Sequence, residues 1–196
     1  MIKTLRATAF LASTIALAGA AIPAAADHHM EKEGMAETSM VGGAEMYPSK
    51  NIVENAANSP IHTTLVAAVK AAGLVDTLAS PGPFTVFAPT NAAFEKLPAG
   101  TVDMLLKPEN KAMLSAVLTY HVVPGDVSAA ALIGLINDNG GMVELETVQG
   151  GTLTASLQDG NVILTDARGG TATVTQADVK QSNGVIHVTD AVSLPG

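Results

Sequence analysis

The five histidines are the residues of this 196-residue chain most suited to metal binding or proton transfer, because the chain contains no cysteine. They are His28, His29, His62, His121 and His187. The sequence has no Gly-x-Ser-x-Gly nucleophile elbow and no His-Glu-x-x-His zinc motif. Glu144 and Glu146 are spaced to share one strand face, but nothing nearby in the sequence suggests an acid partner. We therefore predict that the chain is not an enzyme and that it needs no cofactor.

The segment Asp27-His28-His29 predicts a copper site if an export signal is removed directly before it. A free α-amine, two amide nitrogens and the imidazole of His29, the third residue, can surround Cu(II) or Ni(II) in the square plane that these ions favour. Three methionines follow at five-residue intervals, Met30, Met35 and Met40, and thioethers suit Cu(I). The alternative interpretation is an unstructured tether whose methionines are incidental.

The first 26 residues have the features of a cleaved export signal. Lys3 and Arg6 form a short basic region, and residues 7–22 form an apolar run. Pro23 interrupts this run before the small residues Ala24-Ala25-Ala26, which suit a signal peptidase. The run is short for a membrane span, which needs about 20 residues. We expect cleavage after Ala26, a product without a transmembrane anchor, and a location in the periplasm, in the medium or at the cell surface.

The remaining chain is acidic, and one domain is expected in it. The formal net charge is −8 for the full chain and −10 once Lys3 and Arg6 are removed with the signal. This charge argues against a nucleic-acid partner, because phosphates attract lysine and arginine. Residues 27–46 carry five acidic residues, one lysine and no apolar periodicity, which predicts a flexible leader. Residues 47–196 are long enough for a single domain with one sizeable core. An exported chain without cysteine is more typical of bacteria than of small eukaryotic ectodomains.

Helical periodicity dominates the first half of this domain. We expect helices over residues 49–58, 60–73, 108–121 and 128–136, with single turns near 74–78 and 101–106. His121 ends an apolar stripe, so we expect it to be buried and bonded to the Thr90-Asn91 corner. His62 lies in the first turn of a predicted helix and is expected to be solvated.

One early segment and the second half of the domain predict strands. Residues 84–88 form an apolar run that ends at Pro89, which indicates a strand covered on both faces. Beyond Val143 the period becomes two, and Asp159-Gly160 and Asn183-Gly184 predict two tight hairpins. Helices followed by strands predict an α+β fold with helices packed on a mostly antiparallel sheet system.

Three segments together resemble the signatures of the fasciclin domain family. TVFAPTNAAF (85–94) resembles the first signature, TYHVVPG (119–125) the central tyrosine-histidine motif, and SNGVIHVTDAVSLP (182–195) the closing signature. Their order and separations also match, and the resemblance covers about residues 48–195. MYPSKNIVENAA (46–57) is similar to single-domain bacterial members that carry a signal peptide.

The resemblance implies a wedge of two β-sheets with a helical cap. It also implies a structural signature made by Thr85, Phe87, Pro89, Thr90, Asn91, Phe94, Gly184, Ile186, His187 and Asp190. The motif proposed for adhesion in this family falls on Tyr120, His121, Val122 and Val123. If Tyr120 and His121 are buried, they can act on a partner only by shaping the surface around them.

The function expected from this resemblance is that of an exported adhesion module without catalytic activity. Its partner would be an extracellular protein, a polysaccharide or another copy of the same chain, and deletion would impair attachment or biofilm formation. The first alternative is a carrier of an apolar small molecule such as a carotenoid, since some fasciclin-like proteins bind carotenoids. Alanine-rich helices at 65–72 and 129–136 would allow such a ligand to approach closely. The second alternative is copper binding by the mature N-terminus.

Overall fold

The computed structural model describes residues 38–196, which contain helices and strands in an α+β arrangement. Six helices come before most of the strands: α1 (Ile52–Asn58), α2 (Thr63–Ala72), α3 (Val75–Ala79), α4 (Asn91–Glu95), α5 (Thr101–Leu105) and α6 (Lys111–Tyr120). A 3₁₀ turn, η1 (Pro108–Asn110), precedes α6, and α7 (Ala129–Asp138) follows it. The strands are β1 (Ser39–Val41), β2 (Ala44–Met46), β3 (Phe84–Pro89), β4 (Val122–Pro124), β5 (Met142–Glu146), β6 (Thr152–Gln158), β7 (Asn161–Thr165), β8 (Thr171–Gln181) and β9 (Gly184–Thr189).

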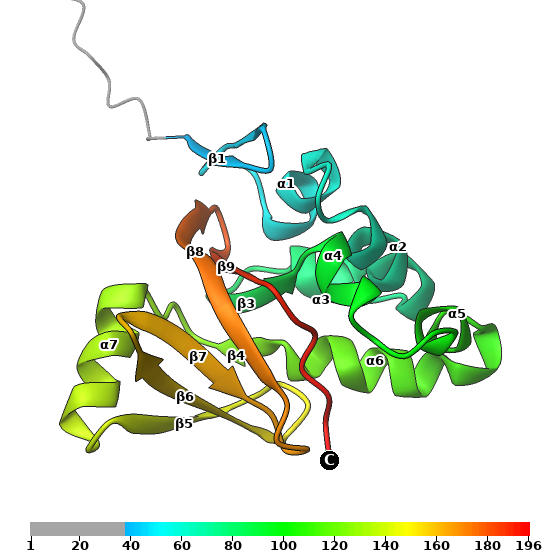
Figure 1. Cartoon of the computed structure of the whole chain (residues 1–196). Helices are drawn as coiled ribbons and strands as arrows, with labels where there is room; N and C mark the ends of the chain where they lie inside the picture. Colours follow the sequence, from blue (N-terminus) through cyan, green and yellow to red (C-terminus); the bar gives the residue numbers. More distant parts are fainter. Residues whose placement is uncertain (1–37) are drawn as a thin grey trace, which may run out of the picture. The chain divides into compact units, whose positions relative to one another are not determined.

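Seven of these strands form one bent sheet in the order β4-β3-β9-β8-β7-β6-β5. Only β3 and β9 run parallel; the other neighbours in this sheet are antiparallel. The long strand β8 pairs with β7 through Thr171 to Thr173 and with β9 from Val174 onward. Its register shifts between Val174 and Val179, and such bulges bend a strand. The sheet therefore opens at β8 into the two halves of a wedge (Figure 1).

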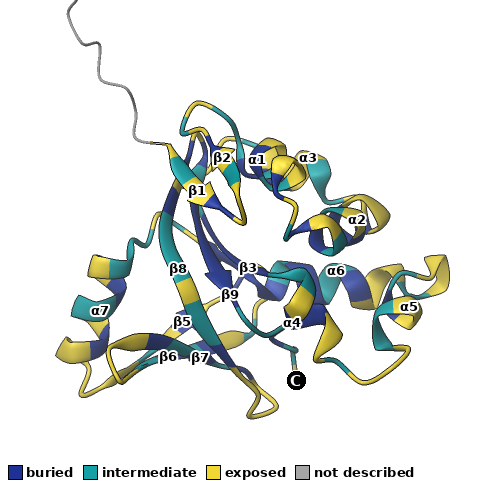
Figure 2. Cartoon of the chain, turned by 45° about the horizontal axis from the view of Figure 1, so that its top comes forward, coloured by how far each residue is buried: buried dark blue, intermediate teal, exposed yellow. Residues whose placement is uncertain are grey.

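Two hydrophobic cores lie on opposite faces of the β3–β9 pair. Val86 and Ala88 belong to the core beneath the helices, whereas Phe87 between them belongs to the core shared with α7 and β5–β7. This alternation follows from the two-residue period of a strand. Figure 2 shows β3 and β9 as buried strands at the centre of the molecule. The expectation that 84–88 is covered on both faces is confirmed, since Thr85 to Pro89 are all buried.

Two predicted helix starts are shifted in the structure. Asn51, not a residue near position 49, caps α1, and its side chain and Glu54 form a reciprocal capping box. The second helix begins at Thr63 rather than at Pro60. The carbonyls of Pro60 and Ile61 instead accept hydrogen bonds from the side chain and the backbone of Asn91. A contact from a distant segment therefore fixes where α2 begins.

The flexible leader predicted over 27–46 is wrong for its last eight residues, because β1 and β2 pair there as a hairpin. Gly42 and Gly43 make the turn with φ of 59° and 87°, which glycine adopts without strain. Val41 and Met46 are buried against the domain, and the side chain of Gln176 donates to the carbonyl of Met40 at 2.8 Å. The predicted signal peptide, the rest of the leader and the segment Asp27-His28-His29 lie outside the described residues.

Candidate functional site

Phe87 on β3 connects the three signature segments. Its amide N–H donates to the carbonyl of His121 at 2.9 Å, which joins the first signature to the central motif. Its ring stacks on the imidazole of His187 with a centroid distance of 5.5 Å, which joins it to the closing signature. Phe87 and His187 are register partners in the parallel pair β3–β9. The three segments that identify the sequence pattern therefore meet at one buried point.

His121 joins the end of α6 to the C-terminal segment. The amide of Ser193 donates to its Nε2 at 3.0 Å, so in the neutral ring the proton lies on Nδ1, which donates to the carbonyl of Val117 at 2.7 Å. Burial lowers the pKa of His121, and the Val117 carbonyl and Asp166 offset this only in part. The prediction that His121 is buried is confirmed. The predicted bond to the Thr90-Asn91 corner is wrong, because Val117 and Ser193 occupy both ring nitrogens.

His187 joins β9 to the loop before α7 in the same manner. The amide of Asp178 donates to its Nδ1 at 3.3 Å, and its Nε2 donates to the carbonyl of Val127 at 2.8 Å. Burial lowers the pKa of His187, and nearby acceptors and acids offset this in part. Thr85 holds the same loop, because its hydroxyl donates to the Gly125 carbonyl at 2.7 Å and accepts from the Val127 amide at 2.8 Å. With both ring nitrogens bonded to backbone, His187 is not free to bind a metal or relay a proton.

The Thr90-Asn91 corner caps two helices. The hydroxyl of Thr90 accepts from the amide of Ala93 at 3.3 Å and so caps α4. Oδ1 of Asn91 accepts from the amide of Thr64 at 3.0 Å and so caps α2, whose own N-cap residue supplies no side-chain bond. This corner therefore satisfies backbone donors of both helices, and its role is structural.

Asp190 connects β9 to two further elements. Its Oδ1 accepts from the amide of Thr173 at 2.7 Å, and its Oδ2 pairs with Lys96 at 3.1 Å on the surface. Partial burial alone would raise the pKa of Asp190, but these two bonds together lower it. The carboxylate is therefore held as an anion by a backbone donor and a lysine rather than prepared for proton transfer.

The motif proposed for adhesion is buried throughout. Tyr120 has no exposed surface, and His121, Val122 and Val123 expose 5% or less. The Tyr120 hydroxyl donates to the carbonyl of Thr152 and accepts from the amide of Ala167 at 3.1 Å, and burial raises its pKa. The remaining signature residues Pro89, Phe94 and Ile186 also lie inside. None of these side chains can touch a partner while the domain stays folded.

Comparison with known proteins agrees with this arrangement. A model of the fasciclin domain matches residues 60–195. The chain belongs to the fasciclin domain family. It is 49% identical over 165 residues to the Synechocystis protein sll1483, covering 84% of each chain. It is 37% identical to the immunogenic protein MPB70 of Mycobacterium bovis, covering 98% of this chain and 97% of MPB70.

Two further relatives bear on surface location and on fold. The chain is 36% identical to the cell surface glycolipoprotein MPB83 of Mycobacterium bovis, covering 71% of this chain and 58% of MPB83. A solved pair of FAS1 domains from the insect cell adhesion molecule fasciclin I superposes with a TM-score of 0.64 at 18% identity. That match covers 73% of this chain and half of the insect domain pair, and it confirms the fasciclin fold.

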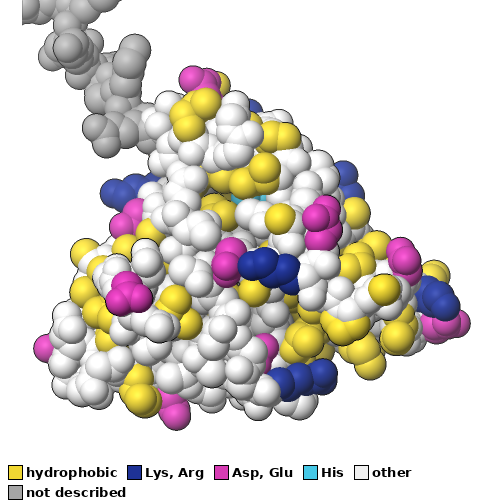
Figure 3. Space-filling view, viewed as in Figure 1, with side chains coloured by type: hydrophobic (Ala, Val, Ile, Leu, Met, Phe, Trp, Pro, Cys, Tyr) yellow, Lys and Arg dark blue, Asp and Glu magenta, His cyan; other side chains and the backbone are white. Residues whose placement is uncertain are grey.

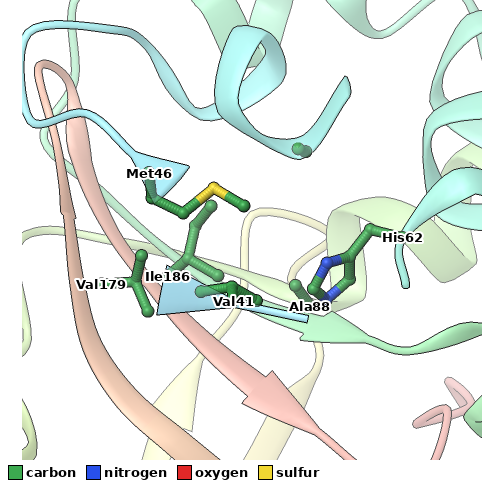
Figure 4. Close-up of a pocket in the computed structure, with 7 residues that line it drawn as sticks. Val41, Met46, His62, Ala88, Val179 and Ile186 are labelled. Carbon is green, nitrogen blue, oxygen red and sulfur yellow. The ribbon is translucent and has the colours of Figure 1, made fainter. Parts of the chain in front are cut away.

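His62 is a buried residue that the sequence reasoning misplaced. It was expected to be solvated, but only 3% of it is exposed in this fasciclin domain. The hairpin β1–β2 lies over it, and Figure 4 shows Val41 and Met46 of that hairpin at the same pocket. The position of His62 at the start of α2 does not by itself indicate burial, because the residues that bury it belong to a hairpin within the segment predicted as a flexible leader.

An open groove of about 380 Å³ lies in the described part of the domain. Leu105 of α5, Met113 of α6 and Leu194 of the C-terminal segment contribute to its walls. Within residues 38–196, no three acidic or histidine side chains are grouped as metal ligands, and no helix is long and apolar enough to cross a membrane. The groove is wide enough to receive a small ligand or a side chain of a partner.

Proposed function

We propose that this protein is an exported, non-catalytic module that attaches to an extracellular protein, a polysaccharide or a second copy of itself. The observation that carries the proposal is that most signature side chains make contacts inside the domain. Recognition of a partner is therefore left to the exposed surface. The names of its relatives, a cell surface glycolipoprotein and an insect cell adhesion molecule, support a location outside the cytoplasm and an adhesive role.

We assign the contact to the face formed by α5 and α6. Met104 on α5 and Met113 on α6 expose 51% and 55% of their surface, and the two helices are packed side by side. Met113 also borders the open groove, so apolar surface continues from the helices into a hollow. Figure 3 shows hydrophobic side chains gathered over these helices. Exposed apolar patches of this kind mark interaction sites.

Introducing positive charge into the apolar surface tests this assignment. We expect the double variant Met104→Lys/Met113→Lys to lose attachment when it replaces the parent protein in a strain of the source organism that lacks the gene. Met142→Lys is the matched control, because Met142 exposes 59% of its surface but lies on β5 at another part of the fold. All three positions are exposed, so stability should change by no more than about 0.5 kcal/mol.

The possible results distinguish the adhesive role of the protein from the assignment of that role to the α5–α6 face. A deletion strain that attaches normally to every surface offered would contradict the adhesive role itself. Equal attachment by the double variant and the Met142→Lys control would retain the role but reject the α5–α6 face. Aggregation of beads coated with purified protein, and its loss in the double variant, would identify a second copy of the chain as the partner.

The second candidate is a carrier of an apolar small molecule, and the groove favours it. Its volume of about 380 Å³ lies within the range of ligand pockets, roughly 300–1,000 Å³, near the small end. It lies between α5, α6 and the C-terminal segment, not beside the alanine-rich helices that suggested a carrier. Protein purified from its own host should then be coloured or release an extractable lipid. Colourless protein without lipid would reject this candidate.

A further inference from the structure

The open groove between α5, α6 and the C-terminal segment combines apolar walls with one cation. Leu105, Met113 and Leu194 contribute apolar surface, and Arg168 is the positively charged residue of the lining. Arg168 is also the one arginine within residues 38–196. No aspartate or glutamate of these residues lines the groove. In a chain with a net charge of −8, this guanidinium is therefore what the groove offers to a negatively charged group.

A hydrogen bond holds the guanidinium against one wall of the groove. Nε of Arg168 donates to the carbonyl of Pro195 at 2.8 Å, and Pro195 itself lines the groove. Figure 1 shows this C-terminal segment running between α6 and the turn that joins β7 to β8. The ion pairs of the described residues use Lys96 and Lys107, so no carboxylate of this part of the chain pairs with Arg168. Its two terminal nitrogens keep their N–H donors, whose fork geometry matches the two oxygens of a carboxylate.

The turn that carries Gln149 adds a neutral donor to the same groove. Oε1 of Gln149 accepts a backbone N–H of its own turn at 2.9 Å, which leaves the Nε2 group available to donate. The buried Tyr120 joins this turn to the turn of Arg168. Its hydroxyl donates to the carbonyl of Thr152 after the first turn and accepts from the amide of Ala167 in the second at 3.1 Å. The two polar residues of the groove therefore come from turns that are held together from inside the domain.

We propose that this groove binds an amphiphile with a single carboxylate head and an apolar chain, such as a fatty acid. The carboxylate pairs with Arg168 and accepts from Gln149, and the chain lies against the apolar walls of α5, α6 and the C-terminal segment. One guanidinium matches the single charge of a carboxylate, whereas a phosphate monoester carries about −1.5 to −2. The proposal rests on the second candidate function, the carrier, and names the class of its ligand.

The test compares two probes with apolar chains of the same length, laurate and dodecanol. The purified exported protein is stripped of lipid, labelled with ¹³C in its methionine methyl groups and titrated with each probe below its micelle concentration. We expect the Met113 resonance at the groove to shift while that of Met142 on β5 stays in place. Laurate should bind at least about 10-fold more tightly, as a charge-assisted hydrogen bond provides. Apolar contact alone would favour dodecanol, which is the less water-soluble probe.

Substitutions assign the preference to the guanidinium. Arg168→Gln should weaken laurate binding by about 10-fold or more and change dodecanol binding by less than about twofold, whereas Arg168→Lys should keep part of the preference. Lys180→Gln is the matched control, because it removes one positive charge from an exposed position on β8 that does not line the groove. Ala116→Phe should weaken both probes, since Ala116 lines the groove. Circular dichroism confirms that each variant is folded.

The results separate the class of ligand from the carrier function. Laurate that binds no more tightly than dodecanol, or that binds Arg168→Gln as tightly as the parent protein, would overturn the carboxylate proposal. Dodecanol binding that Ala116→Phe blocks would in that case still support a carrier of an uncharged apolar molecule. If neither probe binds and the Met113 resonance stays in place, the carrier function in this groove is rejected together with the proposal.

Discussion

Replacement of His121 by leucine is the sharpest test of the internal role of the signature residues. Leucine can fill most of the buried space, but it offers no polar atom. The Ser193 amide, which donates to Nε2 at 3.0 Å, would lose its acceptor in a buried position. The Val117 carbonyl would lose the bond from Nδ1 at 2.7 Å. An unsatisfied buried group costs about 1–3 kcal/mol.

We expect the free energy of unfolding of His121→Leu to fall by about 2–3 kcal/mol. For a domain of this size that corresponds to a decrease in Tm of roughly 4–12 °C. Urea denaturation at neutral pH measures the change, and an unaltered m-value confirms that the same two states are compared. Hydrogen exchange of the Ser193 amide should accelerate, because the C-terminal segment loses a bond to α6.

His121→Gln is the matched control, since its amide oxygen can accept from Ser193 in place of Nε2. It should recover part of the lost stability. If the free energy of unfolding of His121→Leu lies within about 0.5 kcal/mol of that of the parent protein, the structural role of this histidine is refuted. A variant that keeps its stability but no longer attaches would point instead to direct recognition by the motif.

Three further predictions concern pH, close backbone contact and the leader. Burial lowers the pKa values of His62, His121 and His187, so the unfolded chain binds more protons than the folded chain below pH about 6.5. The free energy of unfolding should therefore fall as the pH drops, by at most about 1.4 kcal/mol per pH unit for each histidine. Urea titrations from about pH 7.5 to about pH 5 measure this change. An unchanged unfolding midpoint over this range would contradict their neutral state. Gly184→Ala would drive its Cβ into the carbonyl of Phe84 in the paired strand, so we expect a loss above about 3 kcal/mol or failure to fold; a normal Tm would refute the contact. Cu(II) added to exported protein that begins at Asp27 should give a square-planar absorption band that His29→Ala abolishes, and N-terminal sequencing must find that start.

The two hairpins of the second half were predictable because each depends on local chemistry, although the second turn lies at Ser182-Asn183, one residue before the predicted Asn183-Gly184. Asp159 and Gly160 adopt φ of 52° and 82°, as the tight hairpin signal requires. The helix predicted to end at Gly73 does end there, and Gly73 caps α2 in the left-handed conformation that glycine adopts readily. The burial of His121 could also be predicted, since its place on the apolar stripe is a property of one helix.

The partners of the buried histidines could not be predicted in this way. His121 bonds to Ser193, 72 residues further along the chain, and no periodicity reports such a distance. The hairpin β1–β2 was missed because its two strands have three residues each, and only Gly42-Gly43 signals a turn. The burial of His62 depends on this hairpin, so it could not be predicted without it.

The contacts of Phe87 show that the signature residues shared by the family serve the interior of the domain and not the binding of a partner. Phe87 contacts the central motif by a backbone bond and the closing signature by ring stacking, so a change in any of the three segments disturbs the other two. The insect FAS1 pair keeps the same fold at 18% identity, which leaves most surface positions free to differ. Residues that hold the wedge together therefore identify the family, whereas in the proposed adhesive role the choice of partner depends on exposed positions such as Met104 and Met113.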